Sequence, residues 1–401
     1  MGNGHDAVDH RPDQAGSPTP SLAFAALPPT IEAASQPGEE NEFEINEEPF
    51  NDGTASVSSS VYAFTYERGR RYHCFKNGRY PIPNDDQEQE REDMKHAMLM
   101  ELTDGTPFYA PTGDHPQTIV DVGTGTGELP LGTLLPPCCP ALPSPALPCH
   151  ASWHPRRYEH GRPALVAVTC RDMTDAHPSL GDRYPSARVL GIDLTPIQPV
   201  WLPPNVEFLV DDCEKEWLVA DVDLVHFRFM AIFLHDINLV LSHAYKSMRP
   251  GGWVEFQELD GTPFCDDGTM TDDDAFQRLH HVASEAYAAL GMSMSAASRL
   301  ESVLIDAGFV NIHCKILKVP IGVWAKDKTM RLIGLYQKTA VLEFMPAMAG
   351  RPFEALGIPA AEAQLKLAMA RKALEDTTVH RYFNYYFWYA QKPTEPMSHG
   401  P

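Results

Sequence analysis

Short apolar runs alternate with stretches of helical pattern over most of the chain beyond residue 116. The runs that predict β-strands lie at 118–122, 187–193, 206–210, 223–226, 253–259, 310–320 and 381–390. Helical segments are expected around 331–345 and 359–376, between the last two runs. Apolar strands separated by helices are typical of a parallel sheet that is covered on both faces. The pattern therefore predicts a doubly wound α/β domain with seven strands.

Two further helices have recognisable ends. Apolar residues recur at helical spacing from Ile237 to Met248, and the sequence Arg249-Pro250-Gly251-Gly252 should end that helix and turn into the next strand. Another helix should run to Leu102, with Asn84 or Asp85 as its N-cap and with acidic residues in its first turn. This helix precedes the first predicted strand of the sheet.

The ends of the chain differ from its middle in composition. Residues 1–58 are rich in Pro, Ser, Asp and Glu and have few aromatic residues, so we expect a disordered tail. We interpret 59–115 as an N-terminal helical cap segment, 116–392 as the catalytic domain, and 393–401 as a C-terminal tail.

One segment does not fit this alternation. Between 129 and 178 the chain is rich in Pro and Cys, including Pro130 and Pro136-Pro137, in the place where a parallel sheet requires a crossover helix. An ordinary insertion is one interpretation. We favour an untrimmed intron, because the segment replaces a helix instead of lengthening a surface loop.

Composition excludes several classes of protein. The formal net charge of −22 disfavours direct binding to nucleic acid. No run approaches the roughly 18 apolar residues of a membrane span, and the first residues do not resemble a secretory signal, so we expect an intracellular protein. The eight cysteines form no C-x-x-C pair; we expect free thiols and no metal site.

The candidate chemistry begins where the first predicted strand ends, at Asp121-Val122-Gly123-Thr124-Gly125-Thr126-Gly127. Glycines let a ligand approach the backbone, whose N–H groups could hold the carboxylate of an amino-acid-like cofactor. A dinucleotide site requires a third glycine at position 128, which is Glu128. The loop instead has the (Asp/Glu)-x-Gly-x-Gly-x-Gly form associated with S-adenosylmethionine. A glycine-rich turn without a ligand is the alternative interpretation.

Acidic residues follow the next two predicted strands. Asp193 ends the second strand, where a carboxylate can accept hydrogen bonds from both hydroxyls of a ribose, although it could also cap the following helix. Asp211-Asp212-Cys213 follow the third strand, where a carboxylate can accept from the amino group of adenine; a solvated loop charge is the alternative.

The fourth predicted strand places two candidate catalytic residues, His226 and Arg228, at the same edge of the sheet. His226 is a candidate for removing a proton from the substrate, and a structural role is the alternative. Methyl transfer from a sulfonium depends more on in-line positioning than on acid–base help, because the leaving group is already cationic.

Taken together, these motifs resemble those of the LaeA-like fungal methyltransferases, relatives of the velvet-associated regulator of secondary metabolism. The resemblance covers about 61–127 and 181–392. It is most specific in Tyr66-Glu67-Arg68-Gly69-Arg70-Arg71-Tyr72-His73, Pro83-Asn84-Asp85-Asp86, the segment 121–127, Gly191-Ile192-Asp193-Leu194-Thr195-Pro196-Ile197-Gln198-Pro199, and Pro250-Gly251-Gly252-Trp253-Val254-Glu255.

The resemblance implies a Rossmann-like, mostly parallel sheet with an antiparallel strand near one edge, and S-adenosylmethionine as the methyl donor. It implies an N-terminal segment that packs over the cofactor. It further implies Asp121, Gly123, Gly125 and Gly127 at the methionine end, with Thr124 in the same loop. Asp193 would lie at the ribose, and Asp211 or Asp212 with Cys213 near the adenine. The acceptor, a protein or a secondary metabolite, is not implied.

Three hypotheses follow. The first is an active methyltransferase with an unidentified acceptor, located in the nucleus or cytoplasm, for which the resemblance suggests regulatory protein partners. The second is a catalytically weak regulatory or scaffold protein that keeps the same fold. A nicotinamide-dependent oxidoreductase is the third, and Glu128 disfavours it.

Overall fold

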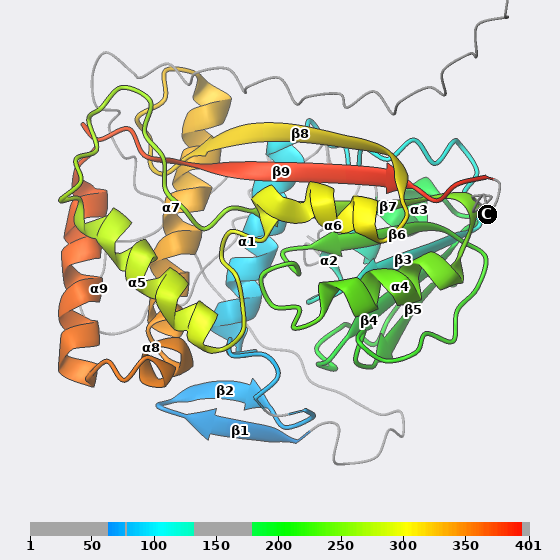
Figure 1. The fold of residues 1–401 in the computed structure, drawn as a ribbon, viewed down its shortest axis with the longest axis horizontal. Helices are drawn as coiled ribbons and strands as arrows, with labels where there is room; N and C mark the ends of the chain where they lie inside the picture. Colours follow the sequence, from blue (N-terminus) through cyan, green and yellow to red (C-terminus); the bar gives the residue numbers. More distant parts are fainter. Residues whose placement is uncertain (1–62, 77, 132–178, 395–401) are drawn as a thin grey trace, which may run out of the picture.

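The computed structural model describes residues 63–76, 78–131 and 179–394. Its centre is a seven-stranded sheet in the order β5-β4-β3-β6-β7-β9-β8 (Figure 1). The strands are β3 (Thr118–Val122), β4 (Arg188–Asp193), β5 (Val206–Val210), β6 (Val222–Arg228), β7 (Met248–Leu259), β8 (Val310–Pro320) and β9 (Tyr382–Gln391). The first five in the sheet order are parallel, and β9 is antiparallel to both β7 and β8. The predicted fold class is confirmed.

The predicted strand positions hold for all seven strands, with one correction. The strand expected at 253–259 begins earlier, at Met248, because Arg249-Pro250-Gly251-Gly252 belongs to β7 and does not form a separate turn. The register between β6 and β7 shifts there, between Val222 and Leu224. A Cβ at Gly252 would lie 2.8 Å from the Val222 carbonyl oxygen, so glycine permits this close approach of two backbones.

Both faces of the sheet are covered. Successive residues of a strand point to opposite faces, so Val120 packs in a core with α4 (Ile237–Ser247) and α6 (Leu300–Asp306). Ile119 packs on the other face with Leu129 and Leu180. These two leucines lie in α2 (Glu128–Leu131) and α3 (Leu180–Arg183), on either side of the predicted insertion.

A short helix follows the glycine loop, although the prolines of the insertion were expected to prevent one. Glu128–Leu131 form one helical turn that contains Pro130, and the Leu131 N–H donates to the Gly127 carbonyl. Proline is tolerated there because the N–H groups of a first turn have no partner within the helix. Residues 132–178, with most of the insertion, lie outside the described residues, as do the predicted tails at 1–58 and, from residue 395 on, the C-terminus.

A second, helical layer adjoins the sheet. It contains α1 (Asp86–Leu102), α5 (Ala275–Ala289), α7 (Lys328–Met348), α8 (Arg351–Ala355) and α9 (Ala360–Glu375). These helices share one apolar core with residues of β8 and β9. In Figure 1, α5, α7, α8 and α9 gather at one end of the molecule, and α1 stands between them and the parallel strands. A short 3-10 helix, η1 (Ala297–Arg299), precedes α6.

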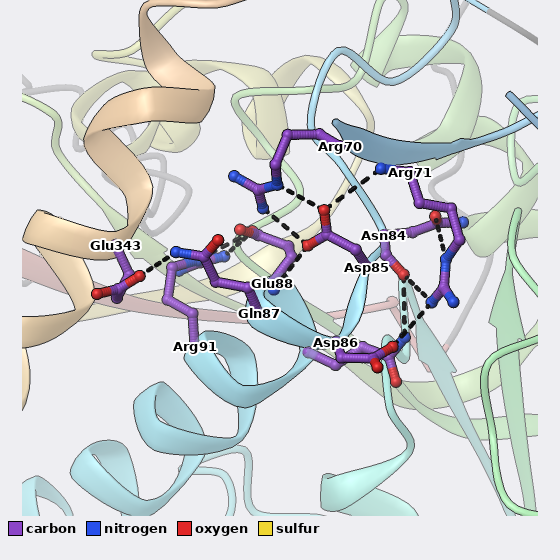
Figure 2. Close-up of polar contacts among 10 residues, drawn as sticks. Arg70, Arg71, Asn84, Asp85, Asp86, Gln87, Glu88, Arg91 and Glu343 are labelled. Carbon is purple, nitrogen blue, oxygen red and sulfur yellow. Dashed lines mark hydrogen bonds and ion pairs between the residues drawn. The ribbon is translucent and has the colours of Figure 1, made fainter. Parts of the chain in front are cut away.

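The N-terminal segment contains a hairpin as well as a helix. The strands β1 (Phe64–Glu67) and β2 (Arg70–His73) pair antiparallel below α1. Asp85 is the N-cap of α1, as the sequence predicted, and its side chain accepts from the Glu88 N–H at 3.2 Å. The same carboxylate is paired with Arg70, whose Nη2 lies 2.8 Å from Asp85 Oδ1 (Figure 2). The hairpin is therefore attached directly to the first turn of α1.

No helix among the described residues has the length and apolar character that crossing a bilayer would require.

Candidate functional site

A cavity of about 240 Å³ lies at the carboxyl edge of the parallel strands. Residues that follow β3, β4, β5 and β6 line it, together with residues of α1, α5 and α7. The connections reverse direction between β3 and β6, and α/β proteins bind ligands at such a switch point. Of the candidate cofactor residues, Gly127 alone does not line the cavity.

The glycine loop after β3 has a left-handed backbone at all three glycines. The φ angles of Gly123, Gly125 and Gly127 are 72°, 58° and 87°. A Cβ at Gly123 would overlap the sulfur of Met230, which lines the same cavity. A Cβ at Gly127 would lie 2.7 Å from the Phe208 ring, so this glycine serves packing beneath the loop.

The backbone N–H groups of the loop are not arranged as expected. Gly123 and Thr124 donate to the Ile192 carbonyl, Gly127 donates to Thr124, and Gly125 donates to Asp193 Oδ2 at 2.9 Å. Donors that are already used within the chain cannot also hold a cofactor carboxylate. These four N–H groups therefore do not hold an anion in this arrangement. For the other N–H groups of the loop, anion binding stays a prediction.

Asp121 lies at the bottom of the cavity and is held on two sides. Its Oδ2 accepts from the Thr124 hydroxyl at 2.8 Å, and its Oδ1 accepts from His226 Nδ1 at 2.8 Å. His226 has no exposed surface and does not line the cavity. This placement does not allow the contact with a substrate that was expected of His226. The ring positions the Asp121 carboxylate.

Asp193 is held by hydrogen bonds from two loops. It accepts from the N–H groups of Gly125 and, at 2.9 Å, Thr195. Burial raises its pKa to about 6. Gln198 completes the loop by donating to the Gly125 carbonyl at 2.6 Å. Each carboxylate oxygen has a second lone pair, so Asp193 can still accept from a ligand hydroxyl.

The segment after β5 borders the cavity on the adjacent side. Asp211 is exposed, and its backbone N–H donates to the Asp193 carbonyl at 2.9 Å. Asp212 and Glu214 face Arg79 from the N-terminal segment, which forms an ion pair with Glu214. Cys213 is packed beneath them, and burial raises its pKa to about 12, so it is a neutral thiol.

The resemblance implied an N-terminal segment over the cofactor, but sequence reasoning did not name the residues of α1 that line the cavity. Glu88, Arg91, Glu92 and Lys95 recur at spacings of three and four residues, which places them on one helical face. That face lines the cavity. Figure 2 shows Arg91 beside Glu88, whose Oε1 accepts from the guanidinium at 2.6 and 2.9 Å. A charged face of a helix ordinarily indicates exposure to solvent, so the helical spacing of these residues did not indicate a binding site.

Two contacts join α1 to the glycine loop. Thr126 donates to Asp93 Oδ1 at 2.7 Å. A Cβ at Gly125 would lie 3.0 Å from Glu92 Oε2. Burial, reinforced by the neighbouring Glu88, raises the pKa of Glu92 to about 8. The helix and the loop therefore form opposite walls of one site.

Arg228, at the end of β6, lines the cavity as its predicted position required. Its Nε donates to Gln257 at 3.0 Å, and Nη1 lies 3.0 Å from His96 Nδ1. Burial lowers its pKa to about 10, which leaves the guanidinium cationic at neutral pH. This is a fixed positive charge in a cavity whose charged residues are mostly acidic: Glu88, Glu92, Asp121, Glu128, Asp193, Asp211, Asp212 and Glu214 against Arg79, Arg91, Lys95 and Arg228.

Comparison with known proteins gives this site its class. Residues 94–314 match the family model described as "Methyltransferase domain". The chain is 31% identical to "Methyltransferase pytC" of Aspergillus terreus, over 91% of this chain and 99% of that protein. The chain belongs to the methyltransferase-domain family. It is a LaeA-like enzyme with S-adenosylmethionine as its cofactor.

Two other relatives are 26% identical. One is "Secondary metabolism regulator LAE1" of Cochliobolus heterostrophus, over 82% of this chain and 95% of that protein. The other is "Protein-methionine methyltransferase laeA" of Emericella nidulans, over 86% of this chain and 83% of that protein. Among solved structures, a phosphoethanolamine N-methyltransferase 2 of Haemonchus contortus in complex with S-adenosylhomocysteine matches with 14% identity and a TM-score of 0.37. That match covers 74% of this chain and 52% of the other.

Proposed function

We propose that the cavity holds S-adenosylmethionine along the ends of β3, β4 and β5 and presents its methyl group to an acceptor beyond β6. The observation that carries this proposal is convergence: Asp121, Gly123, Gly125, Asp193 and the 211–213 segment line one acidic cavity. When bound, the cofactor supplies a methyl group on a cationic sulfur. An excess of carboxylates favours a ligand with that charge.

The residues fit the parts of such a cofactor in order along the sheet. Asp193 would accept from the ribose hydroxyls, and Asp211 or Asp212 would lie at the adenine beside Cys213. Asp121, with its orientation fixed by Thr124 and His226, would face the cationic amino group.

The cofactor carboxylate needs a further partner, because the N–H groups of Gly123, Thr124, Gly125 and Gly127 are already used. Arg228 lies next to the loop, since β6 pairs with β3, and its guanidinium is cationic. We assign it to the carboxylate. From the sequence, Arg228 was a candidate catalytic residue without a defined role.

Two nucleoside ligands separate these assignments. S-Adenosylhomocysteine has both the ribose and the carboxylate, whereas 5′-methylthioadenosine lacks the amino-acid end. Asp193→Ala should weaken both ligands by roughly 1.5–3 kcal/mol, the scale of hydrogen bonds to a charged group. Arg228→Met should weaken S-adenosylhomocysteine alone. Calorimetry checks both variants, and equal losses for the two ligands in Arg228→Met would contradict the carboxylate assignment.

For the biological role, we propose methyl transfer in fungal secondary metabolism, to a protein or to a small metabolite. The names of the relatives support this: one is a secondary metabolism regulator and another a protein-methionine methyltransferase. A catalytically weak scaffold is the alternative. If the full chain transfers a radiolabelled methyl group from S-adenosylmethionine to a protein or a small metabolite, the scaffold hypothesis is excluded.

A further inference from the structure

The cavity extends beyond the part assigned to the cofactor. Past the ends of β6 and β7 its wall becomes largely apolar, and its residues belong to the core that the second, helical layer shares with the sheet. The apolar wall, as we call it, consists of Phe233, Leu259, Met294, Val341, Phe344 and Phe383. Leu259 ends β7, Phe383 lies in β9, and Val341 and Phe344 lie in α7. Phe233 and Met294 lie in the loops after β6 and after α5.

His280 of α5 interrupts this apolar wall. Its side chain is 5% exposed and lines the cavity. The imidazole ring packs against Phe276 and Phe383, with ring centroids 4.4 and 5.3 Å away. A buried polar ring in aromatic surroundings is costly unless its nitrogens are hydrogen-bonded.

The two ring nitrogens of His280 differ. Nδ1 lies 2.7 Å from the carbonyl oxygen of Gly261, just after β7. A carbonyl only accepts, so Nδ1 carries the proton and Nε2 carries a lone pair. Burial lowers the pKa of His280 to about 4, so this neutral tautomer holds at neutral pH. Among the described residues, none donates to Nε2, which is itself buried.

Because Nε2 can only accept, its partner must be a donor. We propose that the part of the cavity formed by the apolar wall and His280 binds a small aromatic acceptor whose hydroxyl donates to His280 Nε2. This proposal rests on the proposed function, since it gives the methyl acceptor its chemical class.

The alternative acceptor class has different requirements. A thioether, such as a methionine side chain, has no proton to donate, so it would leave Nε2 without a partner. A hydroxyl satisfies Nε2 through its proton and keeps oxygen lone pairs for the methyl group. In the transfer an O–C bond would form as the methyl–sulfur bond breaks, S-adenosylhomocysteine would leave, and the hydroxyl proton would pass to His280 Nε2. The structure therefore favours a hydroxylated acceptor.

The test uses 2-naphthol and its hydroxyl-free analogue 2-methylnaphthalene as probes, with the full chain saturated by S-adenosylhomocysteine. The ratio of their dissociation constants measures the hydrogen bond. In His280→Asn the amide can still donate to Gly261, but nothing replaces Nε2. We expect the ratio to shift against 2-naphthol by about five-fold, as for one neutral hydrogen bond.

Matched variants make the result specific. His280→Gln can place an amide oxygen near the position of Nε2 and should restore part of the preference for 2-naphthol. His281→Asn changes an exposed neighbour on the same helix and should match the wild type. An unchanged ratio in His280→Asn, or a wild type that binds neither probe, would overturn this inference. If the wild type does not bind S-adenosylhomocysteine, the proposed function itself is overturned.

Discussion

At the residue scale, the site depends on acidic groups whose charge is not fixed at neutral pH. Glu92 faces the glycine loop from α1, and burial raises its pKa to about 8, so much of it is protonated at pH 7. A cationic cofactor stabilises the ionised form of such a carboxylate, and binding must therefore release a proton below that pKa.

This linkage predicts a pH dependence for cofactor affinity. As pH rises from 6.5 to 8.5, a larger fraction of Glu92 is ionised before binding, so the dissociation constant for S-adenosylmethionine should fall. The fall should be about five-fold if binding lowers the Glu92 pKa by roughly one unit. Calorimetry across this range measures it.

Two variants identify the group responsible. Glu92→Gln should lose most of the pH dependence, whereas Glu101→Gln, at an exposed position of the same helix, should keep it. S-Adenosylhomocysteine, which lacks the sulfonium charge, should show a weaker dependence in the wild type. Identical pH profiles for Glu92→Gln and the wild type would rule out this role.

At the same scale, the sequence predicted a site residue correctly where residues next to it in the chain determine its position. The glycine loop and Asp193 follow apolar strands directly, so their place at one edge of the sheet was predictable. Arg228 was placed correctly at this edge, but its partner His96 belongs to α1. His280 gave no local signal, because its position in the cavity depends on how α5 packs on the sheet.

At the element scale, capping residues and strand patterns predicted most boundaries of helices and strands. The start of β7 differs from its prediction because the backbones of β6 and β7 approach closely there. Asp85 caps α1 as expected, since N-capping depends on adjacent residues. The Pro250-Gly251-Gly252 sequence was interpreted as a turn but lies in β7, because its close neighbour β6 is distant in sequence. The β1–β2 hairpin was likewise not foreseen within the predicted cap segment.

The ends of the predicted insertion lie side by side. A Cβ at Gly181 would be 3.3 Å from the Pro130 carbonyl oxygen, so α2 and α3 are in contact. Replacing 132–178 with a short Gly-Ser linker should therefore be geometrically possible. Closing a shorter loop costs less entropy, by roughly 2 kcal/mol for this change in length.

We therefore expect this replacement to raise both the unfolding free energy and the affinity for S-adenosylmethionine. The affinity should rise because α2, which carries the cavity residues Glu128 and Leu129, would be held more firmly. Chemical denaturation and calorimetry measure the two effects. A protein that unfolds more easily and binds more weakly would show that 132–178 contributes contacts to the enzyme.

At the scale of the whole molecule, two layers share one cavity. The parallel sheet supplies the loops assigned to the cofactor, and the helical layer packed beside it supplies the charged face of α1 and part of the apolar wall. Arg70 and Asp85 attach the N-terminal hairpin to α1, so this segment is part of the same unit (Figure 2). The pattern of apolar residues predicted the sheet well, because the apolar residues of a buried strand are adjacent in the sequence. The same pattern did not predict how the helical layer packs over the sheet.

The central claim is that this cavity binds S-adenosylmethionine through the loop after β3. Calorimetric titration of the full chain tests it most directly, with NAD as a second ligand and Gly125→Asp as the variant. At Gly125 a side chain would meet Glu92 in a left-handed backbone, and a new carboxylate would add repulsion. We predict saturable one-to-one binding of S-adenosylmethionine, no binding of NAD, and no binding of either by folded Gly125→Asp. A wild type that does not bind S-adenosylmethionine, or a variant with unchanged affinity, would contradict the account.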